Sequence, residues 1–285
     1  MASEGQAVQV ACRVLGVSES GYYAWRTRPC SARAVRHAWL TDRIRAVHAA
    51  SRGTYGARRV QAELVLGQSI SVGHQAVKRL MRAAGIRGLS GRPRYRKSAP
   101  QAAARDRVGR QFAREAPDLL WVTDITEHPT REGKVYCAVV LDAYSRRVVG
   151  GAIDAAATGA LVTNALSTAI ETRRPDGPTV IHSDQGTQFG SWAFTRRAQD
   201  AGLLPSMGAA GTCFDCNALM ESFWSRVQVE LLDRQTWSTR LELATALLEY
   251  LELFHNRQRR HSSLGMLTPL EFEARREATA TNTVA

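Results

Sequence analysis

Three acidic residues have the surroundings that point most directly to chemistry in this 285-residue chain. Asp124 stands in the middle of the β-prone apolar run 119–126, and Asp184 comes soon after the apolar run 178–181. Glu221 falls in the first turn of an amphipathic helix pattern. A carboxylate inside an apolar strand is costly unless a cation neutralises it. If the two strands are neighbours and the helix crosses them, the three carboxylates converge.

The ligand set that these carboxylates would form is made of oxygen alone. No His or Cys cluster stands beside them in the sequence, so Mg²⁺ or Mn²⁺ suits the site better than zinc. Two such ions can activate a water or a 3′-hydroxyl and stabilise the leaving oxygen in phosphoryl transfer. Each acid taken alone also fits a helix cap, a turn residue or an ion-pair partner.

The elements that must position these acids alternate between strands and helices. Three β-prone runs separated by short gaps predict an antiparallel meander, and later strands alternate with helices. We therefore expect an α/β fold with a mixed five-stranded sheet and flanking helices. The expected strands are 119–126, 134–142, 147–154, 178–181 and 203–206, and the expected helices are 158–172, 192–201, 218–232 and 240–255. Asn217 is the expected N-cap before Glu221, and the stripe Leu243, Leu247, Leu251 and Phe254 predicts packing or an oligomer surface.

The charge of the chain is concentrated at its front. Residues 1–118 contain 22 Lys and Arg against 7 Asp and Glu, whereas residues 119–285 contain 16 against 19. Arg supplies most of this excess, and its planar guanidinium suits phosphate. The asymmetry favours a nucleic-acid-binding front on a near-neutral body, although a basic surface kept for solubility is the alternative.

The front also contains two helix-turn-helix-like patterns. Short amphipathic helices separated by glycine are expected from Gln6 to about Trp25, with Ser18 as a cap, and from Ser31 to Ala84, with Ser71 capping the last helix. We place this all-α DNA-binding region at 1–86, a basic linker at 87–115 and the catalytic core at 116–285. A helical bundle with incidental arginines remains the alternative. The expected DNA contacts are Arg58, Arg59, Lys78, Arg79, Arg82, Arg92, Arg94, Arg96 and Lys97.

Several multi-residue motifs resemble one known family. WVTDIT (121–126), HSDQGTQF (182–189), NALMESFW (217–224) and HNRQRRHSSLGMLTP (255–269) occur in order, and TYGARRV (54–60) matches at the front. Together they resemble the OrfB-type DDE transposases of the IS-three group of bacterial insertion sequences. The resemblance implies a ribonuclease-H-like, retroviral-integrase-like core in which Asp124, Asp184 and Glu221 are the catalytic and metal-binding triad. Accessory candidates are His182, Asn217, Gln228, Asn256, Arg259 and His261.

Two departures from the family pattern bear on activity. Between Asp184 and Glu221 lie 36 residues, one more than usual, and the extra residue is Cys216. It is either absorbed by a loop before Asn217, or it shifts Glu221 and marks a decayed copy. Gln228 occupies a position where the family often has Lys or Arg, so a phosphate contact there is in doubt.

The function that the resemblance implies is DNA strand cleavage and strand transfer of an insertion sequence. The alternatives are a catalytically impaired DNA-binding regulator and a ribonuclease-H-like nuclease. The resemblance implies double-stranded DNA, a frameshift-fused upstream-frame product and further copies of the chain as partners. Five scattered cysteines and the lack of a signal-like N-terminus favour a reducing cytoplasm, with the protein on the bacterial nucleoid.

Overall fold

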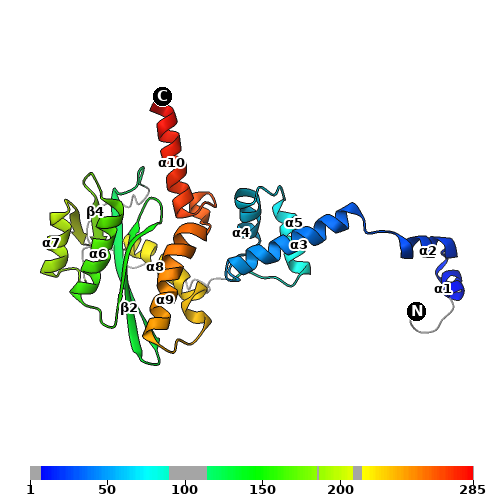
Figure 1. Ribbon diagram of the computed structural model, residues 1–285, viewed down its shortest axis with the longest axis horizontal. Helices are drawn as coiled ribbons and strands as arrows, with labels where there is room; N and C mark the ends of the chain where they lie inside the picture. The colour runs from blue at the N-terminus through cyan, green and yellow to red at the C-terminus, as the bar shows by residue number, and fades with distance from the viewer. Residues whose placement is uncertain (1–7, 90–113, 185, 208–213, 285) are drawn as a thin grey trace.

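A five-stranded mixed sheet forms the centre of the C-terminal part of the computed structural model (Figure 1). The structure describes residues 8–89, 114–184, 186–207 and 214–284. The strands are β1 (Leu120–Thr130), β2 (Gly133–Asp142), β3 (Val148–Asp154), β4 (Val180–Ser183) and β5 (Leu204–Met207). Their order is β3-β2-β1-β4-β5, with β1 to β3 antiparallel and β4 and β5 parallel to β1. The expected ribonuclease-H-like sheet is confirmed.

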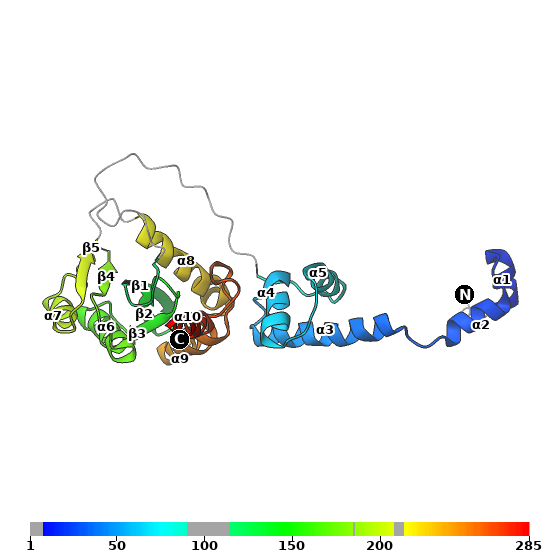
Figure 2. The same cartoon turned by 90° about the horizontal axis from the view of Figure 1, so that it is seen from above.

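Helices cover both faces of this sheet. They are α6 (Gly159–Arg173), α7 (Trp192–Asp200), α8 (Phe214–Glu230), η3 (Leu232–Arg234), α9 (Arg240–Glu249), η4 (Tyr250–Gln258), η5 (Ser262–Leu264) and α10 (Pro269–Val284). Side chains alternate between the faces along each strand. Val122 and Val139 therefore pack with α8, α9 and η4, whereas Trp121 and Val140 pack with α6 and α7. Figure 2 shows α8 and α6 on opposite sides of the sheet.

The start of α8 differs from the sequence prediction. We expected Asn217 to cap a helix from Ala218, but α8 begins at Phe214, so Asn217 lies inside its first turn. The expected helix start at Ala218 is therefore wrong. Cys216 lies in the helix and not in the preceding loop.

The stripe on α9 and η4 is core. Leu243, Leu247, Leu251 and Phe254 are each at most 2% exposed, so packing, and not an open oligomer surface, explains their spacing. They belong to the same apolar cluster as α8 and the face of the sheet beneath it.

The front of the chain is helical, as expected. Its elements are α1 (Val8–Leu15), α2 (Glu19–Thr27), α3 (Ala32–Ala50), α4 (Ala57–Ala62), η2 (Glu63–Gly67) and α5 (His74–Ala83). The Ser18 hydroxyl accepts a hydrogen bond from the Gly21 N–H and caps α2 as predicted. Ser71 does not cap α5, because that helix begins two residues later than expected, after Gly73. The Ser71 carbonyl instead accepts a hydrogen bond from Arg36.

Helices α3 to α5, with η2, form one compact body, which we call the helical unit. Its buried side chains, among them Ile44, Val60 and Val77, belong to the same apolar cluster as those around α8. Figure 1 shows the unit beside the C-terminal helices, with α1 and α2 at the far end. No helix in the described ranges is both long and apolar enough to cross a lipid bilayer.

Candidate active site

Asp124 and Asp184 occupy equivalent positions along two neighbouring parallel strands, β1 and β4. Val122 of β1 lies opposite His182 of β4, and each aspartate comes two residues later in its strand direction. Since adjacent strands lie roughly 4.8 Å apart, this pairing places the two aspartates side by side, Asp124 within β1 and Asp184 just after the end of β4. Asp184 is exposed, and its Oδ1 accepts a hydrogen bond of 2.9 Å from the Gly186 N–H.

The Asp124 carboxyl is strongly perturbed by its surroundings. Burial raises its pKa to about 6, and the negative charges of Asp184 and Glu221 act in the same direction. Hydrogen bonds from the Ile125 N–H, at 2.8 Å, and from Trp224 oppose this rise in pKa. A negative charge raises the pKa of a carboxyl group only when it lies near that group. Both other acids therefore lie close enough to Asp124 to act on it.

Glu221 reaches this region because α8 crosses β1. Met220, Phe223 and Val227 are buried beneath the helix, whereas Glu221 is exposed beside them. One turn beyond Glu221, the Trp224 indole Nε1 donates a hydrogen bond of 3.1 Å to Asp124 Oδ2. This contact joins the helix to the central strand at the acid itself.

Trp224 is the site residue that the sequence analysis missed. It was noted there only as the last residue of the motif at 217–224, with no role at the site. Its spacing of three residues from Glu221 carried the signal, because residues three apart share one face of a helix. Recognising the hydrogen bond also required knowing that α8 lies over β1.

The three acids fit a divalent cation by their chemistry. Among residues that the structure describes, no three His, Cys, Asp or Glu side chains form a closed metal-ligand cluster. The carboxylates therefore lie near one another without converging on one point. Their all-oxygen donor set suits Mg²⁺ or Mn²⁺, and burial together with the two neighbouring acids raises the pKa of Asp124.

Two accessory candidates are engaged within the protein. His182 is 4% exposed, and its Nδ1 lies 3.0 Å from the Ser206 hydroxyl on β5, as in a histidine packed at the end of a strand. The Gln228 amide donates a hydrogen bond to Asp233 and so ties α8 to η3. The side chain of Asn217 lies outside the described part of the chain.

Three known domain families match successive parts of the chain. Residues 36–94 match an HTH-like domain, and residues 114–213 and 201–269 match two integrase core domain families. The transposase for insertion sequence element IS629 of Shigella sonnei is 38% identical over 269 residues, which cover 92% of this chain and 90% of that protein. The chain belongs to the transposases of the IS-three group of insertion sequences.

Other transposase relatives match over similar lengths. Transposase InsF for insertion sequence IS3A of Escherichia coli is 31% identical, with 93% of each chain covered. The insertion element IS600 31 kDa protein of Shigella sonnei is 36% identical over 92% of this chain and 96% of its own. Among solved structures, the HTLV-2 integrase catalytic core domain in complex with magnesium is 18% identical. It covers 56% of this chain and 98% of its own, with a TM-score of 0.40.

Asn256, Arg259 and His261, which form the C-terminal signature within the motif at 255–269, are buried. Asn256 is 2% exposed, and its side-chain amide both donates to and accepts from the backbone of Val148, at 2.8 and 2.9 Å. The amide thereby pairs with the start of β3, an edge strand of the sheet. This placement favours a structural role for Asn256 in fastening η4 to the sheet.

Arg259 makes the most buried ion pair of the signature. Its guanidinium donates two hydrogen bonds, of 2.7 and 2.8 Å, to the Glu230 carboxylate at the end of α8. Both side chains are 4% exposed. The Tyr250 hydroxyl donates a third hydrogen bond to Glu230, at 2.8 Å. Burial raises the pKa of the Glu230 carboxyl. Arg259 and the other groups around it outweigh this effect, so the pKa is lowered overall.

His261 and His255 pack together beside this pair, with ring centroids 4.9 Å apart. Burial lowers the pKa of His255 to about 4 and lowers that of His261 as well, so both rings are neutral near pH 7. The His255 Nε2–H donates a hydrogen bond of 2.8 Å to the Arg146 carbonyl. These positions favour a structural role for His261.

Four of the expected DNA contacts lie on the surface of the helical unit. Arg58 on α4 and Lys78, Arg79 and Arg82 on α5 are exposed, whereas Val77, Leu80 and Met81 on α5 face inward. The helix thus presents a basic outer side. Arg92, Arg94, Arg96 and Lys97 lie outside the described residues.

Arg59 has a different environment from its neighbour Arg58. Its guanidinium lies 5.8 Å from the Tyr55 ring centroid and 3.6 Å from the Glu230 carboxylate. Burial and the positive charge of Arg259 lower the pKa of Arg59, whereas Glu230 raises it. This position favours a contact within the protein over the phosphate contact that we expected.

Proposed function

We propose that this transposase cleaves DNA strands and joins the 3′-hydroxyl ends to target DNA by direct transesterification. Asp124, Asp184 and Glu221 would hold two Mg²⁺ or Mn²⁺ ions. The observation that carries the proposal is geometric. The register of β1 and β4 places the two aspartates side by side, and Trp224 joins the helix that carries Glu221 to Asp124.

The protein groups act by holding charge and position. When bound, the ions would activate the attacking hydroxyl and stabilise the leaving oxygen. The Trp224 indole and the Ile125 N–H orient the Asp124 carboxylate. Their hydrogen bonds counteract part of the rise in its pKa that burial causes. The Gly186 N–H orients Asp184 through its hydrogen bond. These contacts fix two of the three acids before any ion arrives.

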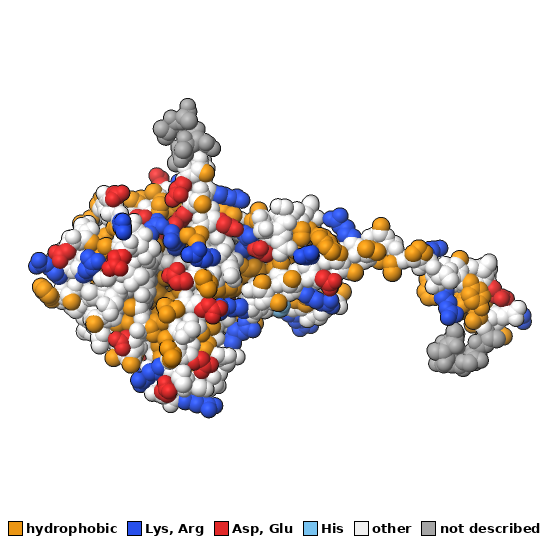
Figure 3. All heavy atoms as spheres, in the orientation of Figure 1, with side chains coloured by type: hydrophobic (Ala, Val, Ile, Leu, Met, Phe, Trp, Pro, Cys, Tyr) orange, Lys and Arg blue, Asp and Glu red, His pale blue; other side chains and the backbone are white. Residues whose placement is uncertain are grey.

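DNA would be held mainly by the basic front of the chain. The exposed side of α5, with Lys78, Arg79 and Arg82, supports docking of this helix in a groove of the duplex. We also propose that the chain works as an oligomer on DNA and is fused to the upstream-frame product. Exposed apolar side chains on α1 and α2, such as Val14 and Trp25 at 78% and 68% exposure, are compatible with such a partner surface (Figure 3).

The inserted Cys216 was the feature that favoured an inactive regulator. It lies in the first turn of α8, before the residues that pack the helix down, which begin at Met220. An insertion there displaces the residues that precede it and leaves the packed register of Glu221 unchanged. The effect of Glu221 on the pKa of Asp124 supports this interpretation. We therefore favour the active enzyme.

The experiment is a strand-transfer assay with labelled element ends and Mg²⁺. Wild type should nick the ends and join them to target DNA, whereas Asp184→Asn should bind the same DNA and yield no product. Binding without cleavage by wild type would support the regulator. Cleavage of RNA–DNA hybrids without joining would support the nuclease.

A further inference from the structure

Helix α8 connects the proposed carboxylate site to the seam between the helical unit and the core. Its middle carries Glu221 and the tryptophan that contacts Asp124. Its last residue, Glu230, is 3% exposed and lies against the helical unit. An α-helix is stiff, with a rise of roughly 1.5 Å per residue, so a shift at one end reaches the other.

Glu230 is held from two parts of the chain. Arg259 and Tyr250, both C-terminal to α8, bind it with three hydrogen bonds. Arg59 comes from α4 of the helical unit and lies 3.6 Å from the Glu230 Oε1. The carboxylate therefore joins the proposed DNA-binding unit to the helix that carries Glu221.

Other contacts keep the helical unit in this position. The Tyr55 hydroxyl donates to the Gln258 carbonyl and accepts from the Arg260 N–H, each at 2.8 Å. Arg260 also forms an ion pair with Glu63 of the unit at 2.6 Å. The seam is thus built from directed hydrogen bonds and charges as well as apolar packing, which fixes the side from which Arg59 approaches.

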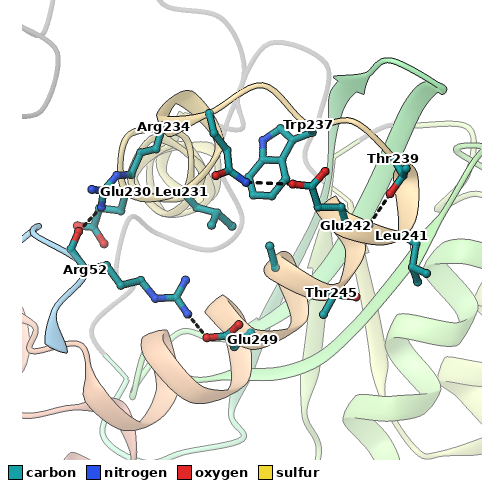
Figure 4. Close-up of a pocket in the computed structure, with 12 residues that line it drawn as sticks. Arg52, Glu230, Leu231, Arg234, Trp237, Thr239, Leu241, Glu242, Thr245 and Glu249 are labelled. Atoms are coloured by element: carbon teal, nitrogen blue, oxygen red, sulfur yellow. Dashed lines mark hydrogen bonds and ion pairs between the residues drawn. The ribbon is translucent and has the colours of Figure 1, made fainter. Parts of the chain in front are cut away.

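An ion pair and a hydrogen bond also cross the seam on its solvent side. A pocket of about 840 Å³ opens there between the unit, the end of α8 and α9. Arg52 reaches across it to Glu249 at 2.6 Å, and Arg234 donates to the Arg52 carbonyl (Figure 4). Arg59 is therefore one of several charged links, and its removal leaves the others in place.

We propose that Arg59 is a positioning residue of the carboxylate site that acts through Glu230 and α8. The inference rests on the proposed function, and it gives the helical unit a second task besides holding DNA. Arg59 ties that unit to the far end of the helix that carries Glu221. Active sites lose activity steeply when a ligand moves by about 1 Å, so a modest release of α8 is enough to matter.

Arg59→Ala tests this more cleanly than a change at Arg259. Glu230 keeps its hydrogen bonds to Arg259 and Tyr250 in that variant, so the fold is retained, which a thermal melt checks. Arg59→Lys keeps the charge and should restore part of any loss. Arg196→Ala, which removes an exposed ion pair to Asp200 on α7, is the matched control.

The full-length proteins are titrated with Mn²⁺, and the free ion is measured by electron paramagnetic resonance. The Asp184→Asn variant lacks one of the proposed ligands, so the Mn²⁺ that it still binds measures binding outside the carboxylate site. Strand cleavage is then measured at saturating DNA. Arg59→Ala should weaken Mn²⁺ binding and lower the cleavage rate by roughly tenfold, with partial recovery in Arg59→Lys and at high Mn²⁺. Arg196→Ala should match wild type.

Unchanged Mn²⁺ binding and cleavage in Arg59→Ala, or a loss confined to DNA affinity, would overturn the proposal. A wild type that binds Mn²⁺ but cleaves no DNA would refute the proposed function. The role of Arg59 would then be judged by the Mn²⁺ titration alone. A wild type without Mn²⁺ binding above the Asp184→Asn level would refute both.

Discussion

The Trp224 indole donates a hydrogen bond of 3.1 Å to the Asp124 carboxylate across the interface between α8 and β1. This bond opposes the burial and charge repulsion that raise the pKa of Asp124. It also holds α8 over the strand at the position where Glu221 approaches. A single side chain therefore influences both the ionisation of one acid and the placement of another.

We expect Trp224→Phe to shift the pH dependence of cleavage. The ring is kept, but the donor is lost, so the pKa of Asp124 should rise above about 6. The acidic limb of a rate–pH profile at low Mg²⁺ should move to higher pH. A profile that is superimposable on wild type would show that the hydrogen bond does not act on the ionised acid.

The stability of the metal-free chain should depend on pH through Asp124. Its folded pKa of about 6 is above its ordinary value of 3.8, so the folded state binds a proton more tightly than the unfolded state. The associated stability is fully present below pH 4 and is lost as the pH rises through 6. The loss is on the order of 3 kcal/mol. Asp124→Asn should remove this contribution from urea melts recorded between pH 4 and 7.

The Arg259–Glu230 pair should be needed for stability. Arg259→Met leaves a buried carboxylate without its bidentate partner, and such changes cost about 3–5 kcal/mol. Arg259→Met combined with Glu230→Met removes both charges and should recover most of the loss. Denaturant unfolding of the single and double variants measures the coupling. Additive losses would show that the two residues do not act as a pair.

DNA binding should be dominated by charge on α5. Each of Lys78→Ala, Arg79→Ala and Arg82→Ala should weaken binding and reduce the slope of log affinity against log salt by about 1. Fluorescence anisotropy at several salt concentrations measures this. A slope unaffected by all three changes would place the DNA elsewhere.

Removal of Cys216 should change cleavage little. The residues that pack α8 against the sheet begin at Met220, so the deletion shifts only the first helical turn. A large gain in cleavage on deletion would show that the insertion had disabled the enzyme.

The sheet could be predicted from sequence because its strands are short apolar runs bounded by turn residues. The first turn of α8 could not be predicted. Asn217 is a residue type that favours an N-cap, and the sequence before Asn217 contains no local signal for a helix that begins at Phe214. The roles of Arg259 and Arg59 were also hidden. Arg259 lies 29 residues and Arg59 171 residues from Glu230 in sequence. Only the folded chain brings both to one carboxylate.

The most direct test of the carboxylate site exchanges Asp184 for cysteine. A thiolate is a poor ligand for Mg²⁺ and a better one for Mn²⁺. If Asp184 holds a catalytic ion, the ratio of cleavage rates in Mn²⁺ and in Mg²⁺ should rise by roughly tenfold or more in Asp184→Cys relative to wild type. An Asp184→Cys variant that cleaves DNA in Mg²⁺ at the wild-type rate, with an unchanged ratio, would contradict the account.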